Sequence, residues 1–175
     1  ALAIRQGLQA IESGNAKILK SVHKPSGIKH FINAADVLRR YPEIFSKGFL
    51  MVGFPDENIG QIKDTIKLAK DMDLDWYTTQ ILTPLPSTEI AQKMIRENQI
   101  DEDEFVKGEV RYSIGSTGKQ GDIEKKEKFH AKPFENLLER NDNYIPTKTE
   151  LNDIWFLVDY KINYEGILNQ ADFIK

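Results

Sequence analysis

The stretch 47–88 limits the possible folds most, because a strand pattern, a helix pattern and a second strand pattern follow one another within it. Phe49–Val52 is a short apolar run closed by turn residues, which is typical of a strand buried on both faces. Trp76–Leu82 is rich in aromatic and β-branched residues and stops before two prolines, so it predicts a second strand. A strand–helix–strand unit of this length predicts a right-handed crossover and parallel strands. Between the strands, one apolar helix face consists of Ile59, Ile62, Ile66, Ala69 and Met72.

Further strand and helix patterns lie on either side of this unit. Ala1–Arg5 is interpreted as the last turn of a helix that stops at Gly7, and Leu8–Ile11 as a short strand. Residues 1–98 therefore alternate as βαβαβα, which is typical of a (βα) barrel segment or a doubly wound sheet. The additional helices are expected over residues 16–22, 28–38 and 88–98.

The remaining sequence divides into two regions, 99–128 and 129–175. The first is charged, contains several glycines and has few large apolar residues, which predicts an exposed, mobile loop region. The second is predicted to be a helical extension. Thr147 and Glu150 form a capping box, in which the Thr147 side chain accepts from the backbone of Glu150, whose carboxylate reaches back. The helix face that follows consists of Leu151, Ile154, Trp155, Val158 and Ile162.

Three parallel strands are few for either fold, because parallel strands need cover on both faces and neighbours on both edges. The chain also starts at Ala1 without an initiator methionine, a signal-peptide pattern or a helix cap. We therefore expect a part of a longer polypeptide, with the other strands encoded before Ala1. The predicted fold is an α/β partial (βα) barrel with a loop-rich, helical C-terminal extension.

Composition and charge exclude several classes of function. The net charge of −3 and the pI of about 5.7 indicate no basic surface excess, so nucleic acid is not an expected partner. No apolar run approaches the roughly 20 residues that a membrane span needs. Without any cysteine, this stretch cannot hold a disulfide, a thiolate zinc site or an iron–sulfur cluster, and its three histidines lack metal-ligand spacing. A reducing cytoplasm is the expected compartment.

Candidate site residues lie where each predicted strand ends, because active sites of parallel sheets form at the carboxyl ends of their strands. Glu12 and Ser13 are suited to bond sugar hydroxyls or an amine, and Gly53 lets a ligand approach the backbone closely. The extended backbone over 80–83 can present N–H and C=O groups to the edge of a planar base. The other candidates in these loops are Gly14, Pro55, Asp56, Glu57, Thr83, Pro84 and Pro86.

Each candidate also has a purely structural interpretation. Ser13 or Asn15 is suited to cap the helix that follows it. Asp56 and Glu57 are expected in a first helical turn, where the helix dipole favours acidic residues. The prolines after the last strand are suited to shape a turn. The two tryptophans, Trp76 and Trp155, are expected to be packing residues.

Three motifs together resemble the radical S-adenosylmethionine (SAM) superfamily. IESGNAKILKSVHK resembles the loop and short helix after the fourth strand of these enzymes, and FLMVGFPDEN resembles the fifth strand with its G-x-P-G-E-T loop. ILTPLPSTEI resembles the sixth strand with its P-x-P-G-T loop. The sequence departs from the pattern at Asp56, Asn58 and Ser87, which replace glycine, threonine and glycine. Each motif alone is weak, whereas three in this order and spacing are much more specific.

The resemblance implies the second half of a (βα)6 partial barrel and a place on the nucleoside side of the SAM site. In that superfamily a [4Fe–4S] cluster, held by a C-x-x-x-C-x-x-C motif after the first strand, reduces SAM to methionine and a 5′-deoxyadenosyl radical. That motif is absent here, so the cluster ligands are expected outside this chain, and no residue of the chain is assigned a catalytic role. The tail is most similar to members with an upstream cobalamin-binding domain. The SAM-contacting residues implied are Glu12 and Ser13 at the ribose, Gly53, Pro55 and Glu57 in the fifth-strand loop, and Ile81, Leu82 and Thr83 at the adenine.

The leading hypothesis is therefore the C-terminal part of a radical SAM enzyme, with SAM, an unidentified substrate and the rest of its own polypeptide as partners. Residues 1–175 in isolation are expected to be inactive and poorly stable. One alternative is a cysteine-free half barrel that pairs with another subunit and catalyses nothing. Another is an unrelated α/β enzyme in which Glu12 and Glu57 act as an acid–base pair.

Overall fold

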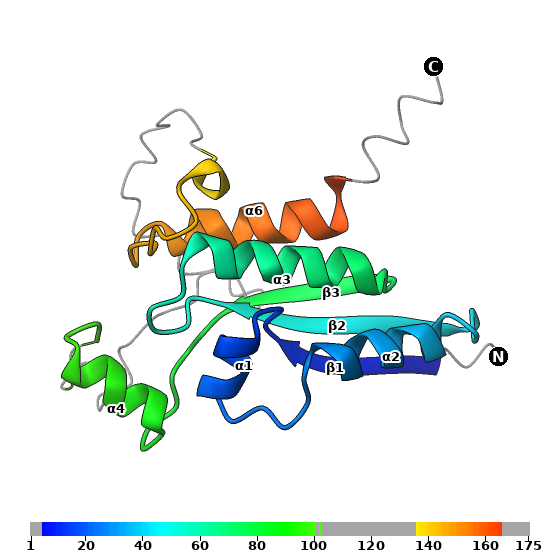
Figure 1. The fold of residues 1–175 in the computed structure, drawn as a ribbon, viewed down its shortest axis with the longest axis horizontal. Helices are drawn as coiled ribbons and strands as arrows, with labels where there is room; N and C mark the ends of the chain where they lie inside the picture. The colour runs from blue at the N-terminus through cyan, green and yellow to red at the C-terminus, as the bar shows by residue number, and fades with distance from the viewer. Residues whose placement is uncertain (1–4, 101, 103–135, 166–175) are drawn as a thin grey trace, which may run out of the picture.

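The computed structural model describes residues 5–100, 102 and 136–165, whose arrangement Figure 1 shows. Three parallel strands lie in the order β1 (Arg5–Glu12), β2 (Ile44–Val52) and β3 (Trp76–Ile81). The predicted α/β segment with parallel strands and a helical C-terminal part is confirmed. Most of the predicted loop region 99–128 lies outside the described residues. The helices are α1 (Ala16–Ser21), α2 (Ile28–Leu38), α3 (Ile59–Met72), α4 (Glu89–Arg96) and α6 (Leu151–Asn163).

The predicted helix end at the start of the chain is wrong for the residues that the structure describes. β1 already begins at Arg5 and runs through Gly7, where a helix was expected to stop. Arg5 pairs with Ile44 and Gly7 with Ser46, so β2 also extends further back than its apolar run indicated. Pairing between strands outweighs the local preference of single residues, and a pattern in one segment does not reveal its partner.

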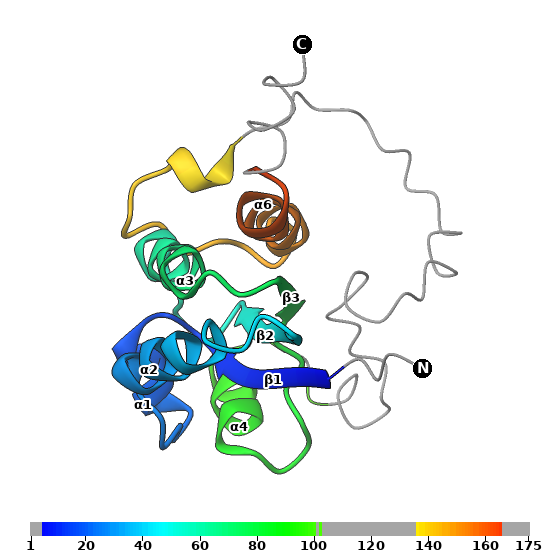
Figure 2. The same ribbon diagram turned by 90° about the vertical axis from the view of Figure 1, so that its right-hand side faces the viewer.

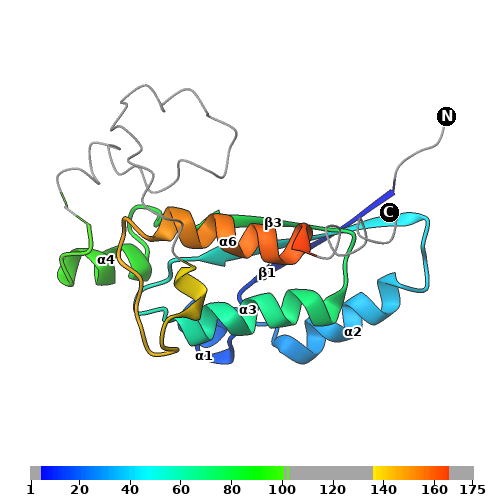
Figure 3. The ribbon, with the colours of Figure 1, turned by 90° about the horizontal axis from the view of Figure 1, so that it is seen from above.

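One layer of helices covers one face of the sheet. In Figure 2, α2 and α3 lie on one side of the strands while α6 lies next to β3, and Figure 3 shows α3 and α6 running side by side along the sheet. Side chains alternate between the faces of a strand, so Leu50 and Val52 are buried under the helices whereas Phe49 is only partly buried. On the opposite face, Leu8 is 60% exposed.

The core lies between the sheet and α3, whose predicted apolar face is confirmed. Ile59 and Ile62 pack with Val52 of β2 and with α6, while Met72 packs with Ile11 and Leu50. Full burial of such a side chain contributes roughly 1.5–3 kcal/mol, so this layer accounts for much of the stability. All five residues of the predicted face are buried, namely Ile59, Ile62, Ile66, Ala69 and Met72.

Helix α6 covers the outer edge of β3 with side chains in place of another strand. The Trp155 indole N–H donates to the Thr79 carbonyl oxygen at 2.7 Å. The Asn163 amide takes both backbone groups of Tyr77, accepting from its N–H at 3.0 Å and donating to its carbonyl at 3.0 Å. An open edge exposes such groups for pairing, and here α6 satisfies them. Trp155 is therefore an edge cap as well as the packing residue that was expected.

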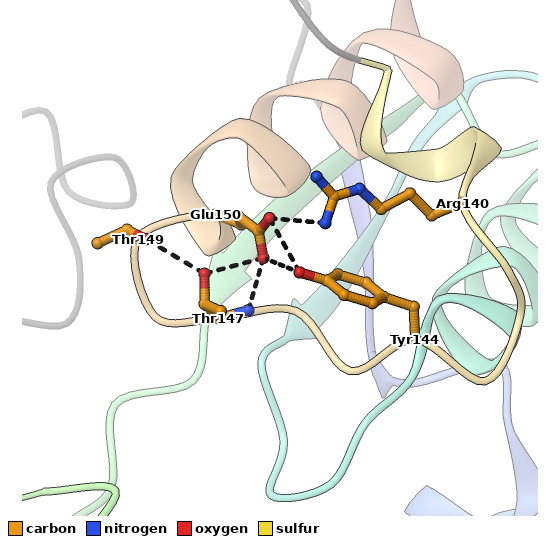
Figure 4. Close-up of polar contacts among 5 residues, drawn as sticks. All are labelled: Arg140, Tyr144, Thr147, Thr149 and Glu150. Atoms are coloured by element: carbon orange, nitrogen blue, oxygen red, sulfur yellow. Dashed lines mark hydrogen bonds and ion pairs between the residues drawn. The ribbon is translucent and has the colours of Figure 1, made fainter.

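The segment before α6 contains a short 3₁₀ helix, η2 (Leu137–Glu139), and then the residues of the predicted capping box, of which only one half forms because the N-cap of α6 is Glu150. As expected, the Glu150 carboxylate reaches back and accepts from the Thr147 N–H at 2.8 Å (Figure 4). The other half differs, because the Thr147 hydroxyl donates to this carboxylate at 2.8 Å, and the Glu150 N–H donates to the Thr147 carbonyl at 3.0 Å. Arg140 Nη1 donates to the other oxygen of the same carboxylate at 2.9 Å.

Candidate functional site

The loops that follow β1, β2 and β3 lie together at the carboxyl edge of the sheet, where its strands end, because the three strands are parallel and neighbours. α4 lies beyond this edge (Figure 1). Left-handed backbone recurs at the edge, with φ of 70° at Glu12, 84° at Gly53 and 62° at Asp56. The predicted convergence of candidate residues is therefore present at the level of the backbone.

The loop after β1 is anchored to α3. Ser13 is 0% exposed, and its hydroxyl lies 3.2 Å from that of Thr65, which also accepts from the Gly14 N–H at 2.9 Å. Gly14 permits this approach, because a Cβ there would lie 2.4 Å from the Asp64 carbonyl oxygen. Asn15 caps α1, as its structural interpretation predicted. The Ser13 side chain thus holds the loop against the helical layer.

Glu12 ends β1 and keeps part of its side chain at the surface. Its side chain is 22% exposed, and its Oε1 lies 3.2 Å from the Lys24 ammonium. A half-open ion pair of this kind stabilises the fold by no more than about 1 kcal/mol. The carboxylate is therefore held in place while it retains acceptor capacity for a further hydrogen bond.

The loop after β2 folds around the side chain of Glu57. Its Oε2 accepts from the backbone N–H of Gly53 at 2.7 Å and of Phe54 at 3.3 Å, and the residue is only 2% exposed. Its Oε1 is buried without a hydrogen-bond partner among the described residues. Burial raises the pKa of this carboxyl group to about 8, although the two backbone hydrogen bonds oppose the rise. Glu57 is therefore protonated in the folded protein at neutral pH.

The expected position of Asp56 and Glu57 in a first helical turn is wrong, since α3 begins at Ile59 with Asn58 as its N-cap. Asn58 forms a reciprocal capping box with Gln61, which starts the helix two residues after Glu57. Asp56 forms an ion pair with Lys93 of α4 instead, and this contact raises the pKa of Lys93. The local capping preference of asparagine determines this helix start.

The first amides of α3 are already occupied. The Ile59 N–H donates to the Tyr144 carbonyl at 2.9 Å, and the Gly60 N–H donates to the Asp142 carbonyl at 2.8 Å. Free amides at a helix N-terminus commonly bind anions, and here the segment before α6 satisfies them. This helix start is therefore not available to a phosphate or carboxylate ligand.

The loop after β3 offers backbone groups rather than apolar side chains. Ile81 is buried in the core, and Leu82 packs with Phe54 while its N–H donates to the Val52 carbonyl at 2.8 Å. Backbone groups alternate along a parallel ladder, so those of Ile81 point to the outer edge of β3. Thr83 is exposed. The main-chain N–H and C=O groups of the residues next to Thr83 are suited to bond the edge of a planar ligand.

Taken together, the sheet edge presents the exposed part of Glu12, the backbone at Gly53 and Pro55, and the strand end at Ile81–Thr83. Ser13 and Glu57 lie close to this edge in sequence, but their side chains are buried. Sequence reasoning did not identify Leu151 or the carbonyls of Asp142 and Tyr144 as neighbours of these loops, since they lie far away in the sequence and carry no motif. Lys24 ends the first motif, but its pairing with Glu12 was not predicted either. A surface hollow lined by Leu38, Pro42 and Leu74, among others, does not include these loops.

Two classes of site have no counterpart in the described ranges. Residues 5–100, 102 and 136–165 contain no group of three or more His, Cys, Asp or Glu side chains placed to hold a metal ion. In the same ranges no helix is long and apolar enough to cross a membrane.

Comparison with known proteins finds radical SAM enzymes among the relatives. The chain is 32% identical over 88 residues to an uncharacterized methyltransferase of Pyrococcus horikoshii, which is 50% of this chain and 19% of that protein. It is 31% identical over 108 residues to the tRNA-2-methylthio-N(6)-dimethylallyladenosine synthase of Vibrio campbellii, which is 61% of this chain and 22% of that enzyme. The chain thus spans about a fifth of the length of these relatives. No protein-family model matches it.

Proposed function

We propose that this chain is part of a radical SAM enzyme and supplies the nucleoside side of its SAM site. The observation that carries the proposal is the convergence of three motif-bearing loops at the carboxyl edge of a parallel sheet. The similarity to radical SAM enzymes supports the same superfamily. The proposal names SAM, an unidentified substrate and the remainder of the polypeptide as partners.

The edge has polar groups that suit a nucleoside. Glu12 has a partly exposed carboxylate held by Lys24, which is suited to accept from ribose hydroxyls. Gly53 and Pro55 add little side chain of their own at this edge, and their backbone is suited to contact the sugar or sulfonium part on the side of Gly53 that Leu151 does not fill. The outward backbone groups of Ile81, followed by Leu82 and Thr83, are suited to pair with the adenine edge. Ser13 and Glu57 would act on the shape of their loops, because their side chains are buried.

The chain has no ligands for the iron–sulfur cluster that the superfamily uses. It contains no cysteine, and cluster irons are bound by thiolates. The cluster therefore belongs to another part of the polypeptide in this proposal, and none of the residues described here binds it. When bound beside such a cluster, SAM supplies radical chemistry. The residues of this chain bind and orient its nucleoside.

The proposed reaction subclass rests on the names of two relatives. One relative is named a methyltransferase and another a methylthio-adenosine synthase, so transfer of a one-carbon or sulfur-containing group is the proposed class. Radical methylation with cobalamin is the specific form that we propose for a polypeptide with an upstream cobalamin-binding domain. Measurement of cobalamin in the purified full-length protein tests that part separately.

The test uses the complete open reading frame, expressed and purified without oxygen. We expect bound iron and cleavage of SAM to 5′-deoxyadenosine, with a raised KM for SAM in Glu12→Gln. Glu43→Gln is the matched control, because Glu43 is an exposed carboxylate that precedes β2. A reading frame that begins at Ala1, with no iron and no SAM binding, would instead support a non-catalytic half barrel that pairs with another subunit.

The acid–base alternative has weaker support. Glu57 is protonated and thus suited to donate a proton, but its 2% exposure leaves no contact with a dissolved substrate. Glu12 is paired with Lys24. Loss of a cofactor-independent turnover in Glu12→Gln would be needed to revive this interpretation.

A further inference from the structure

The segment that precedes α6 contacts both ends of the loop after β2. At the start of the loop, Leu151 packs against Gly53, whose Cβ would lie 3.1 Å from the Leu151 Cδ1. At its end, the carbonyls of Tyr144 and Asp142 accept from the first two amides of α3. The connection 53–60 is therefore held at both ends by residues more than 80 positions later in the sequence.

The contacting segment is itself fixed by a network around Glu150, which Figure 4 shows. Its carboxylate accepts from Arg140 Nη1 at 2.9 Å, from the Tyr144 hydroxyl at 2.8 Å and from the Thr147 N–H at 2.8 Å. The Arg140 guanidinium also lies 4.5 Å from the centre of the Tyr144 ring. Burial raises the pKa of Glu150, but these hydrogen bonds and the Arg140 charge outweigh it and hold the pKa below its ordinary value.

This network joins the two contact points. Tyr144 bonds Glu150 through its hydroxyl and α3 through its carbonyl, and Leu151 directly follows Glu150. Charge-assisted hydrogen bonds of this kind are about twice as strong as neutral ones, so the segment 140–151 has a well-defined shape. That shape determines where Leu151 meets Gly53.

We propose that the segment 140–151 is a positioning element for the loop after β2, and that Leu151 and Glu150 thereby determine the affinity for the nucleoside of SAM. This inference rests on the proposed function. Gly53 adopts a φ of 84°, and glycine has many alternative conformations of similar energy. Leu151 and the two carbonyls restrict the loop to one of them. Neither Leu151 nor Glu150 is proposed to touch the ligand.

The experiment uses the full-length, anaerobically reconstituted protein and equilibrium dialysis with labelled SAM. Leu151→Ala removes the contact with Gly53, and Leu151→Met restores an apolar side chain of similar volume. Glu150→Gln removes the charge that organises the segment. Ile145→Ala is the matched control, because Ile145 is 53% exposed on the same segment.

We expect Leu151→Ala and Glu150→Gln to weaken SAM binding roughly five- to tenfold, because the binding-competent loop becomes a minor population. Leu151→Met and Ile145→Ala should bind like the unaltered protein. Hydrogen exchange should be faster at the Ile59 and Gly60 amides of the two weakened variants. In both weakened variants, kcat at saturating SAM should stay near that of the unaltered protein. A merely structural defect would instead reduce the number of SAM sites per chain.

The outcomes separate this inference from the function on which it rests. If the unaltered protein binds SAM and the folded Leu151→Ala and Glu150→Gln variants bind it equally well, the positioning role is refuted and the proposed function stands. If the unaltered protein fails to bind SAM although its cluster is present, the proposed function fails and the inference falls with it.

Discussion

Replacement of Glu57 by glutamine should change how the stability of the chain depends on pH. Burial raises the pKa of this carboxyl group from 4.5 to about 8 in the folded protein. The folded state therefore binds the proton more tightly than the unfolded state. It follows that the stability contributed by Glu57 is greatest below pH 4.5 and falls as the pH rises from 4.5 to about 8.

The size of the effect follows from the same pKa values. At pH 7, the pH exceeds the pKa of the unfolded carboxyl group by about 2.5 units, whereas the folded group is still protonated. Each pH unit of this difference corresponds to about 1.4 kcal/mol of free energy of unfolding. Wild-type protein should thus lose up to about 3 kcal/mol between about pH 4.5 and pH 7 through this residue. Glutamine is neutral in both states, and its amide oxygen can accept from Gly53 and Phe54 in the same place.

The assay is urea denaturation at about pH 5 and at about pH 7, followed by tryptophan fluorescence. Glu57→Gln should gain about 2–3 kcal/mol relative to wild type between these two pH values. Glu43→Gln, at an exposed carboxylate, should show no such difference. A stability difference between Glu57→Gln and wild type that is the same at both pH values would refute the reasoning, because Glu57 would then be ionised in the folded protein.

Three further substitutions test the anchoring of the loops and the sheet edge, each by urea denaturation. Gly14→Ala should cost at least about 1–3 kcal/mol, since the added Cβ meets the α3 backbone, and wild-type stability would disprove that close approach. Asn15→Ala should cost about 0.5–2 kcal/mol through loss of the α1 cap, and an unchanged midpoint would contradict its capping role. Trp155→Phe should lower the free energy of unfolding by about 1 kcal/mol and increase self-association in sedimentation, because the Thr79 carbonyl loses its partner at the outer edge of β3. A variant that stays as monomeric as wild type would contradict the role of Trp155 as an edge cap.

Several parts of the site could be predicted because they depend on residues that are close in sequence. Asn15 caps α1 as its structural interpretation predicted, since a cap involves only the next few residues. The edge at which the three loops meet followed from the parallel strands. The direction of the Glu57 side chain could not be predicted, because the same G-x-x-x-E spacing suits an acid that faces solvent and one that bonds its own loop.

The sequence by itself determined the βα alternation, the apolar face of α3 and the order in which the strands follow one another, because local periodicity encodes these features. Only the tertiary structure decided which groups remain available at the carboxyl edge of the sheet and along the outer edge of β3. The Ser13 hydroxyl meets Thr65 at 52 positions' separation, and the Trp155 indole meets Thr79 at 76. Contacts at such separations depend on how whole elements pack, so the pattern within any one segment does not specify them.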